Sequence, residues 1–385
     1  MNAFGVIAEY NPFHNGHLNH LREAKRLAGD DAVIVVMSGN FVQRGEPAIL
    51  NKWDRTELAL KNGADLVIEI PTLFCLGNAK QYANASVKLL ESIGCVDRFV
   101  FGSESGNIEA ITSIANCLKE KKSSIDNLIK DFTKEGFSYP RARALAFEKV
   151  FPDNQYTDIL NNSNDALAIE YLLVNSSMKA IAIPRIDNIS ASKVRESYFS
   201  NIDFSNLVPE TTKIKLEECI TTNTNEWFKT LQYAVMNTSN EEIEDCPSGG
   251  EGLGNRIKSL INDSNSWDEF VQLVKSKRYT YTRISRLCMQ IVLGISRKKY
   301  PIDEPKFLHI LGANTKGREV LSQLEKEELN KLPLISNISK QKEQLDDDGL
   351  KLLELDVHAS DIYNLVTGRD VSKMSDYRIP PIIIE

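Results

Sequence analysis

Long apolar runs and paired cysteines are both missing from this sequence of 385 residues. No apolar stretch is long enough to cross a bilayer, and no basic segment with an apolar core opens the chain as a secretory signal would. The six cysteines are scattered without a Cys-x-x-Cys pair, which is typical of reduced thiols in a cytosolic protein. These absences predict a cytoplasmic protein that has no membrane segment.

An overall excess of positive charge is missing as well. The chain has 46 Lys and Arg residues against 53 Asp and Glu, and its net charge is −7. That sign argues against a nucleic-acid partner for the molecule as a whole, although a net charge can hide local patches. The length allows two or three domains, and a content of 42% hydrophobic and 26% charged residues is ordinary for a globular protein.

The first half of the chain alternates short apolar runs with segments of helical periodicity. We expect strands at residues 4–8, 32–37, 66–70, 98–101 and 180–183, and helices at 17–28, 52–62, 79–93, 108–119, 123–135, 139–150 and 165–175. Repeated β-α-β units predict a doubly wound parallel sheet, with its ligand at the carboxyl ends of the strands. After about residue 200 the strand runs vanish and helical periodicity dominates. We therefore predict an α/β fold with a Rossmann-like catalytic domain at 1–200 and a mostly α-helical C-terminal domain at 201–385.

Two histidines, His14 and His17, flank Asn15-Gly16 where the first expected strand runs into a helix. Free backbone N–H groups and the helix dipole attract anions there, and Gly16 lets a phosphate approach the backbone. The imidazoles add donors for the charge that develops when a triphosphate is split at its α-phosphorus. A pair of surface histidines in a turn is the alternative, but the strand, glycine and helix favour a nucleotide site. His20 is rotated well round the helix from His17, so we expect no zinc site.

Polar loops follow the other expected strands. Arg44 in the loop at 38–47 is suited to clamp a phosphate or carboxylate. Gly102 leaves room for a base or a ribose. Ser190 and Ser192 begin an expected helix about one turn before Arg195, which suits the β- and γ-phosphates of ATP, although plain helix capping is the alternative. Because these loops share one sheet edge, we predict that they form one site.

One local patch opposes the negative total charge. Residues 275–299 contain no acidic residue, and Tyr279, Tyr281 and Tyr300 lie in or beside them. This pattern suits an RNA backbone with stacked bases, while a solvated helix face is the alternative. We favour RNA because the charge is concentrated locally against the global sign. The basic residues are Lys275, Lys277, Arg278, Arg283, Arg286, Arg297, Lys298 and Lys299.

Several blocks of the sequence resemble one family. The His-x-Gly-His motif is the hallmark of the nucleotidyltransferase superfamily. Beyond it, residues 5–17 (GVIAEYNPFHNGH), 37–48 (MSGNFVQRGEPA), 64–71 (ADLVIEIP) and 101–104 (FGSE) are similar to the bacterial tRNA(Met) cytidine acetate ligase family. Residues 277–283 (KRYTYTR) resemble a block in that family's helical domain.

The resemblance implies an enzyme that uses ATP and acetate to acetylate N4 of the wobble cytidine in elongator tRNA(Met). It also implies nucleotide contacts, among them an asparagine of the 162–165 turn that is either Asn164 or its neighbour Asn162. Together with the phosphate argument for the later helix, the expected ATP contacts are Ile7, Ala8, Glu9, Tyr10, Asn11, Pro12, Phe13, His14, Asn15, Gly16, His17, Leu18, Asn19, His20, Gly102, Asn164, Arg185, Ser190, Ser192 and Arg195.

The chemistry of such a reaction fits these residues. Acetate is inert towards amines, so it must first attack the α-phosphorus of ATP, releasing pyrophosphate and forming acetyl-adenylate. The N4 amine then attacks the acyl carbon and AMP departs. We expect His14 and His17 to be catalytic, Mg²⁺ to bridge the phosphates without a dedicated protein cage, and Phe13 and Phe41 to cap the acetate methyl group.

Two other functions are compatible with parts of the sequence. An adenylyltransferase acting on a small phosphate-bearing cofactor needs only the first domain, and leaves the helical half and its basic segment unexplained. A non-catalytic RNA-binding module that retains a nucleotide fold does not explain the complete set of strand-end loops.

Overall fold

An eight-stranded sheet is the centre of the computed structural model, which describes residues 2–152, 157–175, 177–185 and 189–385. The strand order is β10-β8-β5-β2-β1-β6-β7, and β9 pairs with β8 off this path. The bounds are β1 Ala3–Ala8, β2 Ala32–Ser38, β5 Leu66–Ile70, β6 Val96–Ser103, β7 Lys179–Pro184, β8 Leu308–Ala313, β9 Leu334–Ile335 and β10 Ile382–Ile383. Each neighbouring pair from β5 to β7 is parallel, which confirms the predicted doubly wound α/β fold.

Helices cover both faces of this sheet, and the apolar strands supply residues to both. In β2, Val33 and Val35 pack into one core, whereas Ile34 and Val36 pack into the other, as the alternation of side chains along a strand requires. The helices of the first half are α1 Asn15–Ala28, α2 Lys52–Lys61, α3 Thr72–Cys75, α4 Ala79–Ile93, α5 Ile108–Glu120, α6 Lys122–Lys134, α7 Tyr139–Val150, α8 Thr157–Asn161, α9 Ser163–Val174 and α10 Ala191–Phe199. A short hairpin, β3 (Phe41–Val42) with β4 (Glu46–Pro47), follows β2.

The second half is mostly helical, but the expectation that strands end near residue 200 is wrong. Its helices are α11 Glu210–Glu218, α12 Phe228–Asn237, α13 Asn240–Asp245, α14 Leu253–Leu260, α15 Trp267–Val274, α16 Tyr281–Val292, α17 Thr315–Glu327, α18 Ile338–Gln341, α19 Asp347–Val366 and α20 Val371–Met374. The chain then returns to the sheet, where β8 runs antiparallel to β5 and β10 runs parallel to β8. A single apolar run of six residues fits a buried strand or a helix turn equally well, and only its pairing with β5 makes it a strand.

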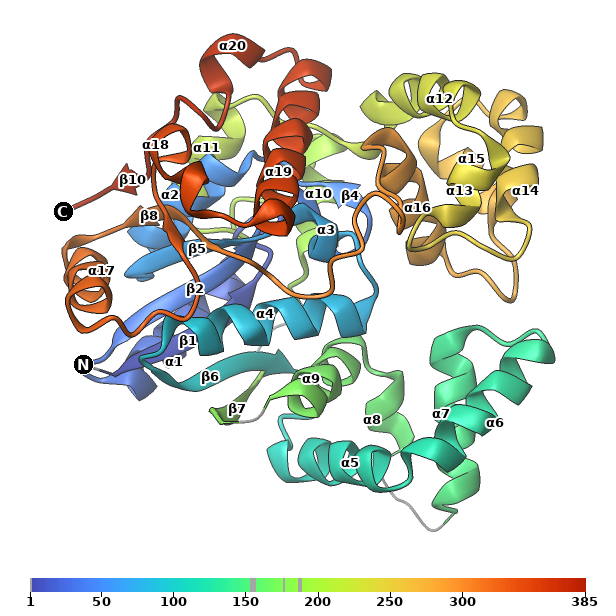
Figure 1. Ribbon diagram of the computed structural model, residues 1–385, viewed down its shortest axis with the longest axis horizontal. Coiled ribbons are helices and arrows are strands. Elements are labelled where there is room, and N and C mark those ends of the chain that lie inside the picture. The colour runs from blue at the N-terminus through green and yellow to red at the C-terminus, as the bar shows by residue number, and fades with distance from the viewer. Residues whose placement is uncertain (1, 153–156, 176, 186–188) are drawn as a thin grey trace.

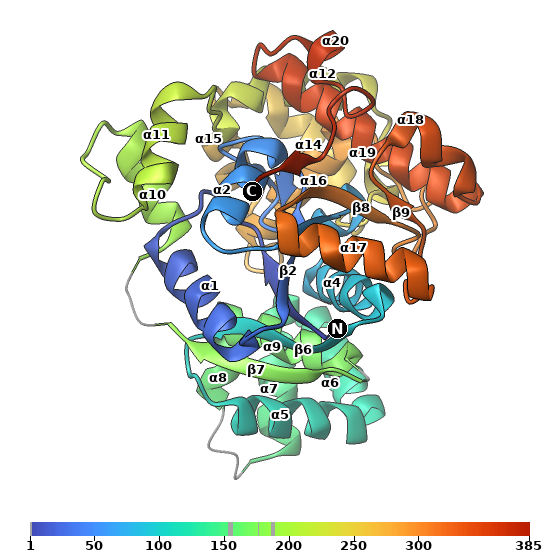
Figure 2. The same cartoon turned by 90° about the vertical axis from the view of Figure 1, so that its left-hand side faces the viewer.

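Two helical groups project from the same side of the sheet. Helices α12–α16 form an upper group and α5–α8 a lower group at the right of Figure 1. Figure 2 shows α5 to α9 below the sheet, beside β6 and β7. None of the helices in the described ranges combines the length and the apolar character that a bilayer crossing requires.

A buried ionic cluster attaches the last part of the chain to the first. Lys52 Nζ on α2 lies 2.8 Å from Glu69 Oε2 on β5 and 2.7 Å from Asp376 Oδ2, and all three side chains are buried. His309 Nδ1 on β8 lies 2.6 Å from the same Glu69 oxygen. The Lys52 ammonium and His309 outweigh the effect of burial on Glu69, and they lower its pKa to about 2.

Candidate active site

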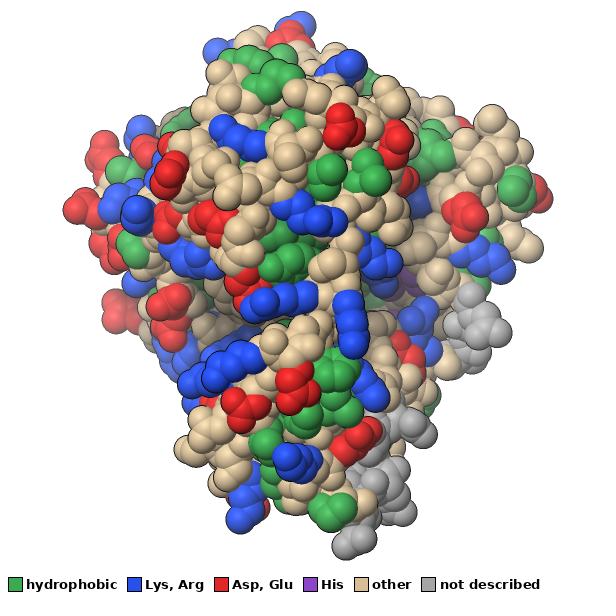
Figure 3. All heavy atoms as spheres, turned by 90° about the vertical axis from the view of Figure 1, so that its right-hand side faces the viewer, with side chains coloured by type: hydrophobic (Ala, Val, Ile, Leu, Met, Phe, Trp, Pro, Cys, Tyr) green, Lys and Arg blue, Asp and Glu red, His purple; other side chains and the backbone are tan. Residues whose placement is uncertain are grey.

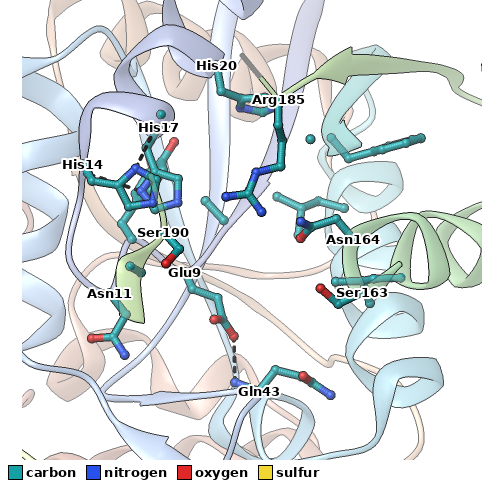
Figure 4. A pocket seen from close by; sticks show the side chains of 18 of the residues that line it. Glu9, Asn11, His14, His17, His20, Gln43, Ser163, Asn164, Arg185 and Ser190 are labelled. Atoms are coloured by element: carbon teal, nitrogen blue, oxygen red, sulfur yellow. Dashed lines mark hydrogen bonds between the residues drawn. The ribbon is translucent and has the colours of Figure 1, made fainter. Parts of the chain in front are cut away.

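One cavity of about 320 Å³ opens at the carboxyl ends of β1, β6 and β7 (Figure 4). It collects residues from the loop after β1, from β6, from the N-terminus of α9, and from the loop that joins β7 to α10. The predicted nucleotide contacts that line it are Ile7, Ala8, Glu9, Tyr10, Asn11, His14, Gly16, His17, Asn19, His20, Gly102, Asn164, Arg185, Ser190, Ser192 and Arg195.

Four other predicted contacts do not line the cavity. Phe13 is buried with its ring against those of Tyr10 and His17. Asn15 donates its backbone N–H to the Leu207 carbonyl and its side-chain amide to the Asn206 carbonyl. The last two are Pro12, which is buried, and Leu18, which packs against the core on the α1 face of the sheet. The sequence motif is continuous, but the strand-to-helix turn directs some of its side chains towards the cavity and others towards the core.

His14 and His17 hold each other in place at the start of α1. The N–H of His17 donates to Nδ1 of His14, and the N–H of His14 donates to Nδ1 of His17, each over 3.3 Å. Because both Nδ1 atoms accept, each neutral ring carries its proton on Nε2. A Cβ on Gly16 would lie 2.9 Å from the His14 ring, so the glycine leaves room for this arrangement.

The cavity keeps its three histidines neutral. Burial, reinforced by the Arg185 cation, lowers the pKa of His14 to about 4. Burial and the neighbouring histidines lower the pKa of His17 well below its usual range. Burial lowers the pKa of His20 to about 4, and His20 lines the same cavity although the helix rotates it away from His17. At the start of α1, neutral His14 and His17 rings would be N–H donors that add no positive charge.

The start of α10 is capped by its own serine and also lies at the cavity, so phosphate binding by its serines stays a prediction. Ser190 is the N-cap of α10 and accepts from the N–H of Lys193 at 3.2 Å, so the capping alternative holds. Ser190 and Ser192 also line the cavity. Arg195 donates to the Asn11 carbonyl at 2.7 Å and to Glu46 at 3.0 Å, which fixes its guanidinium at the cavity wall.

The part of the cavity at Gly102 has free space beside the backbone. A Cβ added to Gly102 would have no neighbour closer than 4.0 Å, so a planar group can approach its backbone. Asn164 lines this end and donates its side-chain amide to Glu104 at 2.7 Å. Asn162 instead precedes α9 and donates to Asp165 at 3.1 Å. The geometry therefore favours Asn164 over Asn162 as the contact.

Some cavity residues carry no sequence signal, and some expected ones are elsewhere. Tyr82 on α4 and Tyr171 on α9 line the cavity, but in the sequence they lie within ordinary helical segments. Phe41 lies outside the cavity lining, because its ring packs against those of Trp227 and Tyr363. The expectation that Phe13 and Phe41 cap the acetate methyl group is therefore wrong. Arg44, which the sequence did single out, is exposed at the cavity rim.

The arginines of the basic segment are hydrogen-bonded within the protein, whereas its lysines are exposed, with Lys277 over the Phe137 ring and Lys299 over the Tyr300 ring. Arg283 donates to Ser248 and Glu251, and Arg286 donates to the Gln43 carbonyl. Arg278 pairs with Glu251, and Arg297 donates to the Glu244 and Pro247 carbonyls. Figure 3 shows Lys and Arg gathered across the face that carries the two helical groups, with a histidine at the bottom of a hollow between them. The exposed lysines of the segment are Lys275, Lys277, Lys298 and Lys299.

A strand-to-helix turn that places a stacked histidine pair in a cavity at the carboxyl ends of a parallel sheet is typical of nucleotidyltransferases of the His-x-Gly-His class. The family model described as HIGH Nucleotidyl Transferase matches residues 1–377, and the chain belongs to that family. The chain is also 37% identical to the tRNA(Met) cytidine acetate ligase of Clostridium perfringens, with full coverage of both, and 38% identical to that of Thermoanaerobacter pseudethanolicus, with 95% coverage of each. It belongs to the family of tRNA(Met) cytidine acetate ligases.

The fold agrees with this assignment over the whole chain. The crystal structure of Thermotoga maritima TmcAL bound with alpha-thio ATP superposes with a TM-score of 0.91 at 31% identity, and all of both chains is covered. The crystal structure of the same protein without ligand gives the same TM-score at 30% identity.

Proposed function

We propose that this chain is an ATP-dependent ligase that converts acetate to acetyl-adenylate and transfers the acetyl group to N4 of the wobble cytidine of elongator tRNA(Met). The observation that carries this proposal is the pairing of a neutral, stacked His14–His17 donor pair with an open end at Gly102 and Asn164 in one cavity. Full-length similarity to ligases of that name, and to a TmcAL structure with an ATP analogue, supports it.

ATP fits the cavity in one orientation. Its phosphates belong at His14, His17 and the N-terminus of α10, where neutral imidazole N–H groups, backbone N–H groups and Arg195 meet. Its base belongs at Gly102 and Asn164, where a flat group has space and an amide can form hydrogen bonds. The α-phosphorus then lies between these ends, beside the loop that carries Arg44.

The residues supply positioning and charge stabilisation to the first step. Acetate attacks the α-phosphorus, the bond to the bridging oxygen of pyrophosphate breaks, and the negative charge that develops is met by the imidazole donors. Arg44 is suited to orient the acetate carboxylate. In the described residues no three His, Cys, Asp or Glu side chains form a metal cage, so Mg²⁺ would be held mainly by the phosphates that it neutralises.

The helical part carries a basic surface that a simple adenylyltransferase would not need. We propose that the basic segment at 275–299 holds the tRNA backbone, because its exposed lysines lie on the face shown in Figure 3. A transferase that joins ATP to a small phosphate-bearing cofactor has no use for such a surface.

Pyrophosphate exchange tests this proposal. Radiolabelled pyrophosphate should enter ATP in an acetate-dependent manner, and digests of tRNA(Met) after reaction with ATP and acetate should contain N4-acetylcytidine. Replacing acetate by butyrate should reduce exchange by about tenfold or more, because a site shaped for a methyl group excludes the longer chain. Exchange that ignores acetate but responds to nicotinamide mononucleotide would instead establish the simple adenylyltransferase.

A further inference from the structure

Glu9 carries a negative charge in a cavity that is expected to hold a triphosphate. It lies directly after β1, is half-buried, and lines the cavity whose other charged side chains include Arg44, Arg185 and Arg195. A carboxylate repels phosphate oxygens, so its charge does not serve to bind the triphosphate. Its position calls for a partner that carries an N–H or O–H donor.

The Glu9 carboxylate is fixed in one orientation. Its Oε1 atom accepts the backbone N–H of Gln43 at 2.7 Å, and Figure 4 shows the side chain directed away from the two stacked histidines and towards Gln43. Among the described residues, Oε2 takes no hydrogen bond, and it is not sealed from the cavity. One oxygen is therefore anchored, and the other is available to a donor that enters the cavity.

The loop that anchors Glu9 is held in turn by the helical group. Arg286 Nη1 on α16 donates to the Gln43 carbonyl at 3.2 Å, and Ser285 Oγ donates to the Gly45 carbonyl at 2.8 Å. Gly45 has a φ of +80°, and a Cβ there would lie 2.2 Å from the Arg286 backbone nitrogen. The Glu9 side of the cavity thus adjoins the helix that carries part of the basic segment.

We infer that the free oxygen of the Glu9 carboxylate receives the cytosine N4 amine at the acetyl-adenylate and accepts its proton during acetyl transfer. This inference rests on the proposed function, and it adds a catalytic residue for the second step. A carboxylate that accepts from the N4 amine of cytosine is a known form of base recognition. Because the base would enter from the α16 side, it would reach Glu9 before it reaches the histidines.

Glu9 is the one protein group that the acetyl-transfer step needs to balance its bonds and protons. The N4 lone pair forms a bond to the acyl carbon, and the bond between that carbon and the phosphate oxygen breaks, so AMP leaves with the electron pair. N4 begins with two hydrogens and ends with one, and the lost proton moves to Glu9 Oε2. Release of that proton to water restores the carboxylate for the next turnover.

The surroundings of Glu9 suit a proton acceptor. Burial raises the pKa of Glu9, while the Gln43 N–H and Arg44 lower it in part. A raised pKa makes a carboxylate a better proton acceptor. The other charged or titratable groups that face Glu9 are Glu46 on the hairpin, Arg195 on α10, Arg55 on α2, Cys75 on α3, Tyr82 on α4 and Tyr171 on α9.

Glu9→Gln separates this role from a structural one. The amide oxygen of glutamine can still accept the Gln43 N–H, whereas the side chain can no longer take up a proton. With chemically prepared acetyl-adenylate and tRNA(Met), the variant should transfer the acetyl group about 10²–10⁴-fold more slowly in a single turnover. Acetate-dependent pyrophosphate exchange should fall far less than transfer does, since that step needs no base. Glu23→Gln, which removes an exposed carboxylate from α1 outside the cavity, is the matched control and should change neither rate.

The pH profile gives a second measurement. Transfer by the unmodified chain should rise with pH as Glu9 loses its proton, and this rise should be absent in the Glu9→Gln variant. Transfer by the variant within threefold of normal, or an equal loss of exchange and transfer, would overturn the inference for Glu9. Failure of the unmodified chain to acetylate tRNA(Met) would overturn the proposed function, and the inference with it.

Discussion

The imidazole rings of His14 and His17 stack with their centroids 3.6 Å apart and their planes 18° from parallel. Two cationic rings would repel at this distance, so the stack is incompatible with a charge on both histidines. The reciprocal N–H to Nδ1 bonds set both rings to carry Nε2 protons. The pair thus presents neutral donors to a phosphate without the cost of burying two charges.

Replacing either histidine should slow adenylate formation. His14→Ala or His17→Ala should cost roughly 2–4 kcal/mol of transition-state stabilisation in acetate-dependent pyrophosphate exchange, the usual effect of removing one donor to a developing anion. Binding of ATP itself should weaken less, because the ground-state phosphate carries less charge at the attacked centre. The control is His358→Ala on α19, an exposed histidine outside the cavity, which should exchange normally. Near-normal exchange in a folded double variant would remove both histidines from the mechanism.

The neutral histidines should also make stability depend on pH. Between the ordinary pKa of 6.5 and the lowered pKa of about 4 at His14, the unfolded chain binds a proton that the folded chain does not. Stability should therefore fall as pH falls through this window, by about 1.4 kcal/mol per pH unit for one such group. Glu9 and Asp356 act in the opposite sense, because their pKa values are raised by folding.

Comparison with a variant isolates the histidine contribution. His14→Asn retains a side-chain oxygen that can cap the His17 N–H, so α1 should still begin at the same place. Urea unfolding at pH 7, 6 and 5 should show a smaller loss of stability in the variant than in the unmodified chain. Parallel curves would mean that His14 titrates normally in the folded protein.

The sequence predicted the parts of the site that local order determines. A strand, a glycine and a helix start sufficed for the His14 and His17 turn, and α4 begins and ends at the predicted residues. Local patterns work here because the hydrogen bonds of a strand-to-helix turn join residues three positions apart.

Contacts between distant segments could not be predicted in this way. Gln43 and Arg286 are bonded across 243 positions, and nothing near either residue in the sequence indicates the other. The pairing of β8 with β5 could not be predicted either, because the sequence around β8 is mostly helical. Phe41 is a third case, because an apolar side chain suits a pocket and a core equally. Which of the cavity residues contact ATP stays a prediction.

The basic segment should bind tRNA through its exposed lysines. Lys277→Glu with Lys298→Glu should weaken tRNA(Met) binding and flatten its dependence on salt, since fewer counterions are released. ATP affinity should be unchanged, because neither residue lines the cavity. Lys326→Glu with Lys340→Glu makes the same charge change outside the segment, on α17 and α18, and should have little effect. If the salt dependence of tRNA(Met) affinity is the same for the two double variants, the segment is only a solvated surface.

Substitutions in the buried ionic cluster at Lys52 should lower the free energy of unfolding by different amounts, and by more than the loss of a surface ion pair does. Lys52→Met leaves the buried Glu69 and Asp376 carboxylates without their shared cation, and should cost about 3–5 kcal/mol of unfolding free energy. Asp376→Asn should cost less, because Lys52 keeps Glu69 as a partner at 2.8 Å. Lys61→Met lies on the same helix and breaks only the half-exposed pair with Glu57, so it should change stability by about 0.5 kcal/mol or less. Urea unfolding of the three variants gives the order directly. If Lys61→Met lowers the unfolding free energy as much as Lys52→Met does, the loss comes from a weakened α2 helix and not from the ionic cluster. The attachment of the C-terminal segment to β5 would then depend on its apolar contacts.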